Sequence, residues 1–108
     1  MFGVAKVGDH GHGSCKAGHT DVKKGQAKEM TTEFLTGSSD VILNGMPVAL
    51  VGAIGHTTCG HHTEALTGSS TVFVNGMPIH RLGDAGVVSD DGGGDYDTIT
   101  ASTDVYAG

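Results

Sequence analysis

The chain has 108 residues and few large apolar side chains, with 19 Gly, three Phe, two Tyr and no Trp. This composition predicts a single domain, residues 1–108, with a modest core that needs further stabilisation from a metal, a partner or a closed sheet. The formal net charge of −6 argues against nucleic acid as a partner. No apolar run approaches the ~18 residues of a membrane-spanning helix, and the N-terminus lacks a basic-then-apolar signal pattern, so classical secretion is not expected.

The first predicted element is a short arm, Val4 to Asp9, which is followed by a long connection from Asp9 to Glu33. We expect a short helical turn near Lys23 to Met30 and no long helix anywhere. The connection carries a cluster of possible metal ligands, namely His10, His12, Cys15 and His19. Cysteines and histidines clustered in a chain without a secretion signal indicate metal binding more than a disulfide.

Two nearly identical segments follow, Leu35 to Gly52 and Leu66 to Gly83, with eleven of eighteen positions the same. Each runs from Gly-Ser-Ser into β-branched or aromatic residues, meets Asn-Gly, and continues as a second apolar arm. Such residues favour strands, and Asn-Gly is the strongest short hairpin signal because both residues tolerate positive φ. Each segment is therefore predicted to form a strand, a tight turn and a second strand.

Two further connections separate these elements, Ala53 to Ala65 and Asp84 to Thr98. The earlier one carries a second cluster of possible ligands, namely His56, Cys59, His61 and His62. The later one has no His or Cys. Its acidic run, Asp90 to Asp95, lacks the ligand spacing of a calcium-binding EF-hand and is expected to be a flexible acidic loop.

A third copy of the repeat is divided between the two ends of the chain. Ile99 to Gly108 matches the first arm of each repeat, and Val4 to Asp9 matches the second arm. We predict that the two ends lie together, with Tyr106 near Val4 and Val7, and close the chain into a pseudo-three-fold ring. Closure removes the exposed strand edges that short sheets otherwise leave open.

The fold class is accordingly predicted to be all-β, a small cone of three hairpin repeats. The three connections should converge at one pole, and the Asn-Gly turns should lie at the opposite end. Two of these connections carry thiols and imidazoles, the ligands that Zn²⁺ prefers in its tetrahedral sites. The predicted ligand set is Cys15, His19, Cys59 and His61, with zinc as the metal and iron possible at the same site.

Other ligand sets remain open at this point. Three histidines and one cysteine could bind instead, with His12 or His56 replacing a thiol, and Cys15 could form a disulfide with Cys59. His62 points away from His61 in an extended segment. His10 is expected to face solvent or to lie just outside the ligand set, and His80, on a strand arm, is expected to be a surface or packing residue.

The repeated pattern resembles the PAAR-repeat proteins over nearly the whole chain. The residues that carry the resemblance are Gly68-Ser69-Ser70, Asn75-Gly76, Pro78 to Arg81 and Gly83-Asp84. The Pro-Ala-Ala-Arg segment that names the family is only loosely matched, as Pro78-Ile79-His80-Arg81 and Pro47-Val48-Ala49-Leu50. The third connection departs from the family because it carries no His or Cys, so the first two connections are expected to supply every ligand.

The resemblance implies a structural, membrane-piercing tip that caps the trimeric β-helical spike of a contractile phage tail or a type VI secretion system, with a zinc ion at the apex. It further implies a monomer in isolation, one chain per spike trimer, and a target membrane that is pierced rather than stably bound. The protein would be made in the bacterial cytoplasm and act at the virion or secretion-apparatus tip, with no catalytic residues. The alternative is a zinc-dependent hydrolase using the Cys/His loops, although four protein ligands favour a closed site over a catalytic one.

Overall fold

The computed structural model describes residues 2–18, 23, 25–90 and 92–108. These residues form twelve β-strands and no helix. The described part of the chain therefore contains no helix that could cross a bilayer. The strands are β1 (Phe2–Gly3), β2 (His10–Cys15), β3 (Lys28–Phe34), β4 (Ile42–Leu43), β5 (Met46–Pro47), β6 (Ile54–Thr57), β7 (His62–Ala65), β8 (Phe73–Val74), β9 (Met77–Pro78), β10 (Ala85–Val88), β11 (Gly94–Thr98) and β12 (Tyr106–Ala107). The all-β prediction is confirmed.

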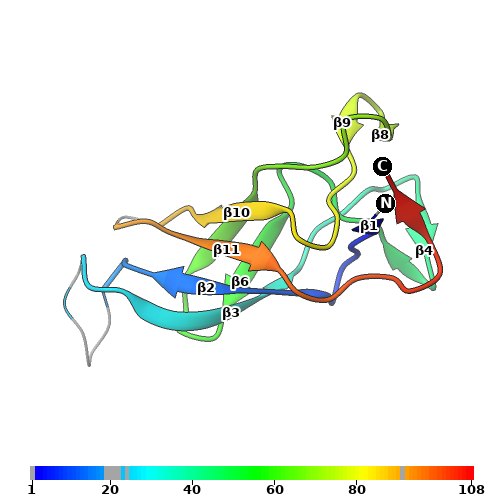
Figure 1. Ribbon diagram of the computed structural model, residues 1–108. Coiled ribbons are helices and arrows are strands. Elements are labelled where there is room, and N and C mark those ends of the chain that lie inside the picture. Colours follow the sequence, from blue (N-terminus) through cyan, green and yellow to red (C-terminus); the bar gives the residue numbers. More distant parts are fainter. Residues whose placement is uncertain (1, 19–22, 24, 91) are drawn as a thin grey trace.

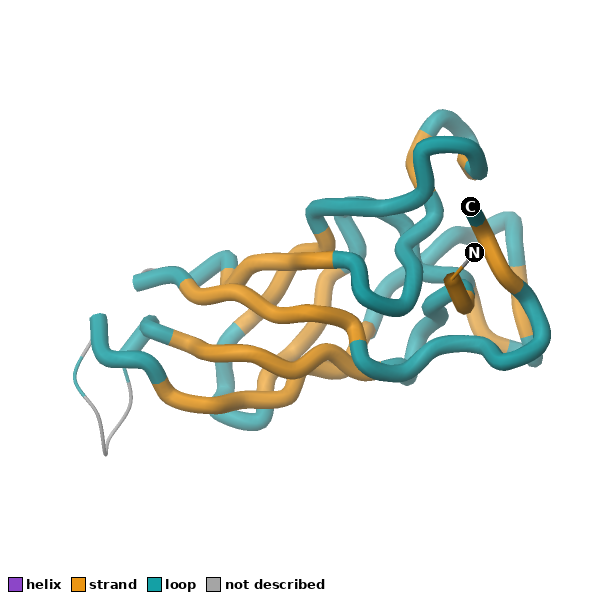
Figure 2. The backbone as a smooth tube through the Cα atoms, viewed as in Figure 1, coloured by secondary structure: helices purple, strands orange, loops and turns teal. Residues whose placement is uncertain are grey.

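The strands are arranged as a narrow barrel joined to a broader base. Six strands close into the barrel in the order β10-β11-β2-β3-β6-β7, and the other six form three two-stranded sheets, β1-β12, β4-β5 and β8-β9. Figure 1 shows the three small sheets gathered at one end of the barrel, together with both chain termini. Figure 2 shows that the strands of the barrel run along its length toward the opposite end. With extents of 39 × 24 × 22 Å, the molecule is a small β cone.

The two predicted Asn-Gly turns connect the strands of the base. Asn44 and Asn75 have φ of 52° and 51°, and the glycines that follow have φ of 81° and 83°. Two consecutive positive φ values are the requirement of the tight turn whose twist matches a β-hairpin. The prediction of a strand, a tight turn and a strand in each segment is therefore confirmed.

The two chain ends form the third unit of the base. Phe2 pairs with Ala107, Gly3 pairs with Tyr106, and the Val4 amide donates to the Val105 carbonyl over 3.0 Å. This pairing confirms the predicted closure of the ring. The last residue is held further, because its carbonyl accepts hydrogen bonds from the hydroxyls of Ser69 and Thr71 in the neighbouring unit.

A ring of backbone hydrogen bonds joins the three units at the centre of the cone. The amide of Ala5 donates to His80 over 3.0 Å, that of His80 to Ala49 over 2.9 Å, and that of Ala49 to Ala5 over 2.9 Å. All three residues are fully buried. Around this ring, three antiparallel β-bridges each join one unit to the next, namely Val4–Arg81, Lys6–Val48 and Leu50–Ile79. One chain thus builds its own approximate three-fold axis.

The three connections named from the sequence are hairpins of the barrel. In β3 the side chains of Met30, Thr32 and Phe34 are buried, and the residues between them face outward or are partly exposed. The helical turn expected near Lys23 to Met30 is wrong for residues 28–30, since this alternation has the period of a strand. Before the strand, the amide of Gln26 donates to the carbonyl of Lys23 over 3.0 Å in a single turn. The sequence signal was weak because Gly, His and acidic residues, which are common in these connections, do not favour strands on their own.

Glycines make the bore of the barrel narrow enough to pack around a few side chains. A Cβ added at Gly11 would lie 2.3 Å from Cδ1 of Tyr96, and one at Gly86 would lie 2.1 Å from Cε2 of the same ring. At the third equivalent position, Gly55, a Cβ would lie 2.5 Å from Oγ1 of Thr63. The interior around them is filled by Phe34, Tyr96 and Met30, and so a modest core suffices.

Candidate functional site

The candidate metal centre lies at the end of the barrel farthest from the base, where each hairpin of the barrel turns (Figure 1). Cys15 is the last residue of β2, Cys59 lies in the turn between β6 and β7, and Asp90 follows β10. Each repeat arm ends in a glycine followed by one further residue, namely Asp9, Ala53 or Asp84. Cys15, Cys59 and Asp90 each lie six residues after that further residue, which makes the three equivalent under the pseudo-three-fold relationship.

The two thiols face each other inside this end of the barrel. Cys15 is fully buried, and both cysteines are free, so the alternative of a disulfide is not formed. Burial raises the pKa of the Cys15 thiol, and hydrogen bonding with Cys59 and the charge of Asp90 add to that rise. The sulfur of Cys59 also lies 3.1 Å from the hydroxyl of Thr57. Two adjacent thiol groups form a donor pair that a thiophilic metal could bind.

An imidazole and a carboxylate are paired at the same end. Nδ1 of His61 lies 2.9 Å from Oδ2 of Asp90, and Nε2 lies 3.2 Å from the carbonyl oxygen of Gly18. The hydrogen bond from His61, together with one from the amide of His62, lowers the pKa of the Asp90 carboxyl. Both ring nitrogens therefore face acceptors, which fixes the imidazole among the turns of the barrel.

The predicted ligands are only partly visible as a set. Cys15, Cys59 and His61 lie at one end of the barrel, whereas His19 is outside the described residues. Within the described ranges, no three side chains of His, Cys, Asp or Glu are arranged to hold a metal ion in their present conformations. Asp90 is the site residue that sequence reasoning missed, since the third connection was expected to contribute nothing. Its spacing from the end of the repeat is the signal that could have found it.

The alternative ligands lie elsewhere. On β2, His10 and His12 alternate with the inward-facing Gly11, and Nε2 of His12 lies 2.7 Å from Oε1 of Glu29. His56 and His62 are exposed on the outside of β6 and β7. In this conformation none of the four lies beside Cys15 in the bore.

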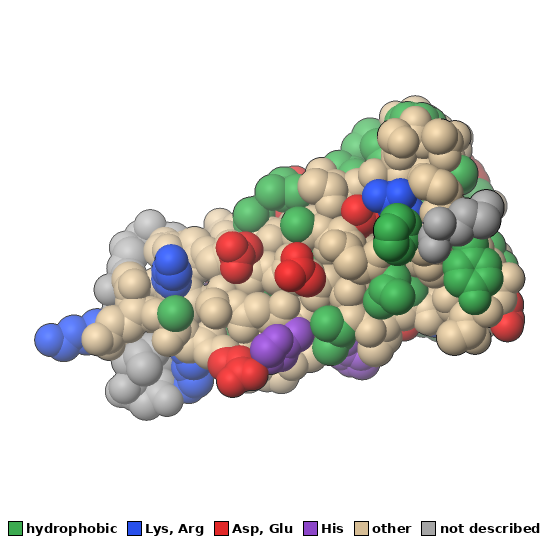
Figure 3. Space-filling view, in the orientation of Figure 1, with side chains coloured by type: hydrophobic (Ala, Val, Ile, Leu, Met, Phe, Trp, Pro, Cys, Tyr) green, Lys and Arg blue, Asp and Glu red, His purple; other side chains and the backbone are tan. Residues whose placement is uncertain are grey.

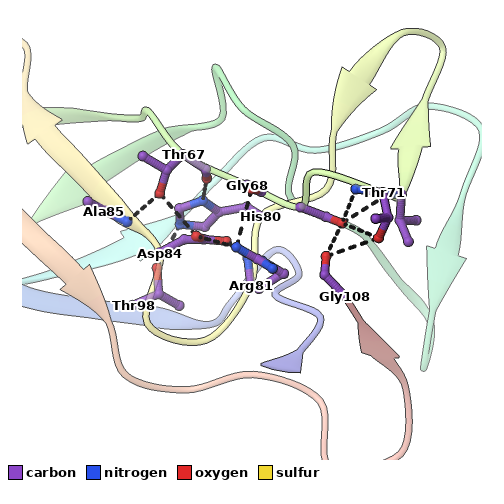
Figure 4. A network of polar contacts seen from close by, with 11 residues as sticks. Thr67, Gly68, Thr71, His80, Arg81, Asp84, Ala85, Thr98 and Gly108 are labelled. Atoms are coloured by element: carbon purple, nitrogen blue, oxygen red, sulfur yellow. Dashed lines mark hydrogen bonds and ion pairs between the residues drawn. The ribbon is translucent and has the colours of Figure 1, made fainter. Parts of the chain in front are cut away.

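His80 lies on the three-fold axis, far along the chain from either cluster, and is completely buried. Its ring packs edge-on against Phe34 at 5.3 Å, and both of its nitrogens have polar partners in the network of Figure 4. The expectation of a packing role is confirmed, although the residue is not at the surface.

The same network holds an ion pair that fastens the β8-β9 unit to the barrel. Nε of Arg81 lies 2.9 Å from Oδ2 of Asp84, and Nη2 reaches the carbonyl oxygen of Gly68, as Figure 4 shows. Burial alone would raise the pKa of Asp84, but the hydrogen bonds from Arg81 and Thr67 outweigh it and lower that pKa. The unit formed by the two chain ends has the matching pair Lys6–Asp9 at 3.1 Å.

The broad end of the cone carries apolar side chains at equivalent positions of the three units. Ile42, Phe73 and Tyr106 are exposed to 56%, 53% and 50%. A second equivalent set is also exposed, namely Met46, Met77 and Phe2. Figure 3 shows that hydrophobic side chains are concentrated at this end, where a few charged side chains also lie, whereas the histidine side chains lie along the barrel. We refer to these six residues as the apolar base, and an exposed patch of this kind is typical of a protein interface.

Comparison with known protein families matches residues 24–86 to the PAAR motif. The chain belongs to the PAAR-motif family. The match spans more than half of the chain and includes both Asn-Gly hairpins of the base and the β6-β7 hairpin of the barrel. No curated protein matches the chain.

PAAR proteins are structural components of the spike tip in contractile injection systems, and they associate with spike proteins. Family membership thus gives this chain a structural role at the spike tip of a secretion or phage apparatus.

Proposed function

We propose that this PAAR protein caps the trimeric β-helical spike of a contractile injection machine, with one chain per trimer. The observation that carries the proposal is the hydrogen-bonded ring of Ala5, Ala49 and His80, through which one chain builds a three-fold arrangement. Homo-oligomers ordinarily need three chains for such an axis. A chain with its own axis can instead present one hairpin of its base to each of three identical subunits.

The apolar base is the surface that would meet the spike. The end of a trimeric β-helix has unpaired backbone groups, which need a cover. The base offers Ile42, Phe73 and Tyr106 at equivalent positions of three short hairpins. Such a match would cover the spike end and bury the apolar side chains of the base.

We further propose that the narrow end binds one zinc ion, with iron as a possible substitute. Cys15, Cys59 and His61 would bind it, together with His19 or Asp90. The support is the chemistry of the donors: two free thiols in mutual contact, and an imidazole hydrogen-bonded to a carboxylate, as is usual for histidines that bind zinc. Bound zinc would supply folding free energy where the bore is too narrow for a large core.

The resulting tip would work mechanically, by remaining rigid at a point while it pierces a target membrane at the head of a phage tail or secretion apparatus. In this proposal it has no substrate and no turnover. Three features would contribute to this rigidity: the closed barrel, the hydrogen-bonded ring and the ion pairs that fasten two of the three units.

Mass measurement by light scattering tests the stoichiometry. The isolated chain should be a monomer, and its complex with the trimeric spike end should contain one chain per trimer. Phe73→Asp should weaken the complex, because it places a charge in the apolar base. Asp95→Asn, on the outer face of β11, is the matched control and should leave binding unchanged. A stable homotrimer of this chain, or three copies per spike, would overturn the proposal.

A further inference from the structure

Two histidines that lie outside the bore face each other on the flank of the barrel. His56 of β6 is the direct antiparallel partner of His62 of β7. The adjacent residue pair is hydrogen-bonded, since the amide of Thr57 donates to the carbonyl of His61 over 2.7 Å. His56 and His62 therefore form a non-hydrogen-bonded pair, the type in which opposite side chains approach most closely. Their ring centroids are 5.4 Å apart.

The surroundings of this pair add negative charge. Glu33 of β3 is the direct partner of His56 on the other side, and its side chain is exposed on the same outer face. Oδ1 of Asp90 lies 3.7 Å from Nδ1 of His62. Two imidazoles held side by side on a rigid sheet, with a carboxylate on the neighbouring strand, are the donors that borderline divalent metals prefer.

We propose that His56 and His62 bind a divalent transition metal ion, such as Ni²⁺, Cu²⁺ or Zn²⁺, on the outside of the barrel, with Glu33 as the adjacent carboxylate and water completing the coordination. The rings now meet edge to face at 76°, so each has to turn about its side-chain torsions before both nitrogens point at one ion. His62 is 56% exposed and His56 is also exposed, so this rotation meets little steric resistance.

The sheet is what makes the pair a chelate. A single exposed imidazole binds such ions weakly, but two groups held at a fixed separation can gain roughly 10²–10⁴-fold in affinity. Because β6 and β7 are both members of the closed barrel, their separation is set before any metal arrives. The bound ion would brace the β6-β7 hairpin, and through Glu33 also β3, beside the narrow end of the cone.

This flank site is separate from the candidate centre in the bore. Cys15 faces inward and is fully buried, whereas His56 and His62 are exposed on the outer surface. The strand register and the exposure of the side chains define this flank site, whether or not the protein caps a spike.

A nickel titration followed by ¹⁵N NMR locates the site. Ni²⁺ is added to labelled protein whose metal content has been measured beforehand, and paramagnetic broadening reports the position of the ion. The broadening should be centred on the amides around His56 and His62. His56→Gln and His62→Gln should each weaken nickel binding by roughly 100-fold. His12→Gln is the matched control, because His12 also faces outward on the barrel, and it should leave nickel binding unchanged.

Comparing His56→Gln with His62→Gln separates a loss of nickel binding from a disturbed fold. His62 is the neighbour of His61, so His62→Gln could disturb the narrow end. His56→Gln avoids that problem, and the spectra of both variants without nickel show whether the fold is intact. Broadening centred on Cys15 and Cys59, or nickel affinity unchanged in His56→Gln, would overturn the proposal.

Discussion

The imidazole of His80 lies 2.7 Å from the hydroxyl oxygen of Thr98, and neither side chain is accessible to solvent to more than 2%. The Nδ1 atom of His80 lies 2.7 Å from the carbonyl oxygen of Thr67, and a carbonyl oxygen can only accept a hydrogen bond. Nδ1 therefore carries the proton, and Nε2 accepts a hydrogen bond from the Thr98 hydroxyl. The neutral imidazole has both nitrogens satisfied at a ring position that the other two units fill with alanine.

Acid should remove the stability that this arrangement provides. Burial lowers the pKa of His80 below its ordinary value of 6.5, although the Thr67 carbonyl and Asp84 partly oppose the shift and Arg81 adds to it. As pH falls below about 6.5, the unfolded chain takes up a proton that the folded chain does not. The contribution of His80 is thus complete above that pH and is lost progressively below it.

The measurement compares unfolding free energies of the wild type and His80→Gln at pH 8 and pH 5.5. At pH 8 the variant should be less stable by roughly 1–3 kcal/mol, and at pH 5.5 the difference should be smaller. Other titrating groups, including any bound metal, affect both proteins and cancel in the difference. The corresponding difference for the exposed His12→Gln should be close to zero throughout, and a pH-independent difference for His80→Gln would contradict the argument.

Removing the hydroxyl of Tyr96 should not destabilise the protein. This hydroxyl is buried and has no hydrogen-bond partner among the described residues, so it loses its hydration on folding and regains nothing. Tyr96→Phe is expected to leave the free energy of unfolding unchanged or to raise it by about 1 kcal/mol, as measured by urea denaturation. Tyr106→Phe is the control at an exposed site, where the hydroxyl donates to the Thr103 carbonyl. A clear loss of stability in Tyr96→Phe would indicate a polar partner for this hydroxyl.

Cys59→Ser should harm folding far more than His10→Ala. If the narrow end binds zinc, the serine variant loses a thiolate ligand, whereas His10 lies on the outer side of β2. Structural zinc contributes about 10–16 kcal/mol in small zinc-finger peptides, against about 5–15 kcal/mol for the stability of a whole domain. Melting temperature and metal content after dialysis are the readouts, with about one zinc per wild-type chain expected. Similar melting temperatures for the two variants would argue against Cys59 as a ligand.

The closed ring predicts that the chain tolerates circular permutation. Ala107 pairs with Phe2 as Leu43 pairs with Met46. Joining the chain ends would place two residues between the paired strands, the same number as in the Asn-Gly turns. A permutant with Gly108→Asn and Met1→Gly, joined there and opened between Asn44 and Gly45, should retain the fold. NMR amide shifts are the check, and a permutant joined in this way that does not fold would show that the ends contribute more than pairing.

The base could be predicted from the sequence because its signals are local. Asn44-Gly45 and Asn75-Gly76 specify tight turns, and the β-branched residues before them specify strands, whatever surrounds them. The repeat also showed that the two ends complete a third unit. Cys15 and Cys59 could be placed together for the same reason, since equivalent positions of a closed repeat meet around its axis.

The barrel and the direction of its side chains were decided only by the tertiary structure. Segments such as His10–Cys15 have little strand preference, and they become strands because neighbours pair with them on both sides. Side chains alternate between the two faces of a strand, and a shift of one residue exchanges the faces. The sequence alone therefore does not say that Cys15 faces inward and His56 outward, because that depends on the strand register. The same holds for Asp90, which meets His61 only when two hairpins turn at one end, and for His80, which is buried because three strand arms close around it.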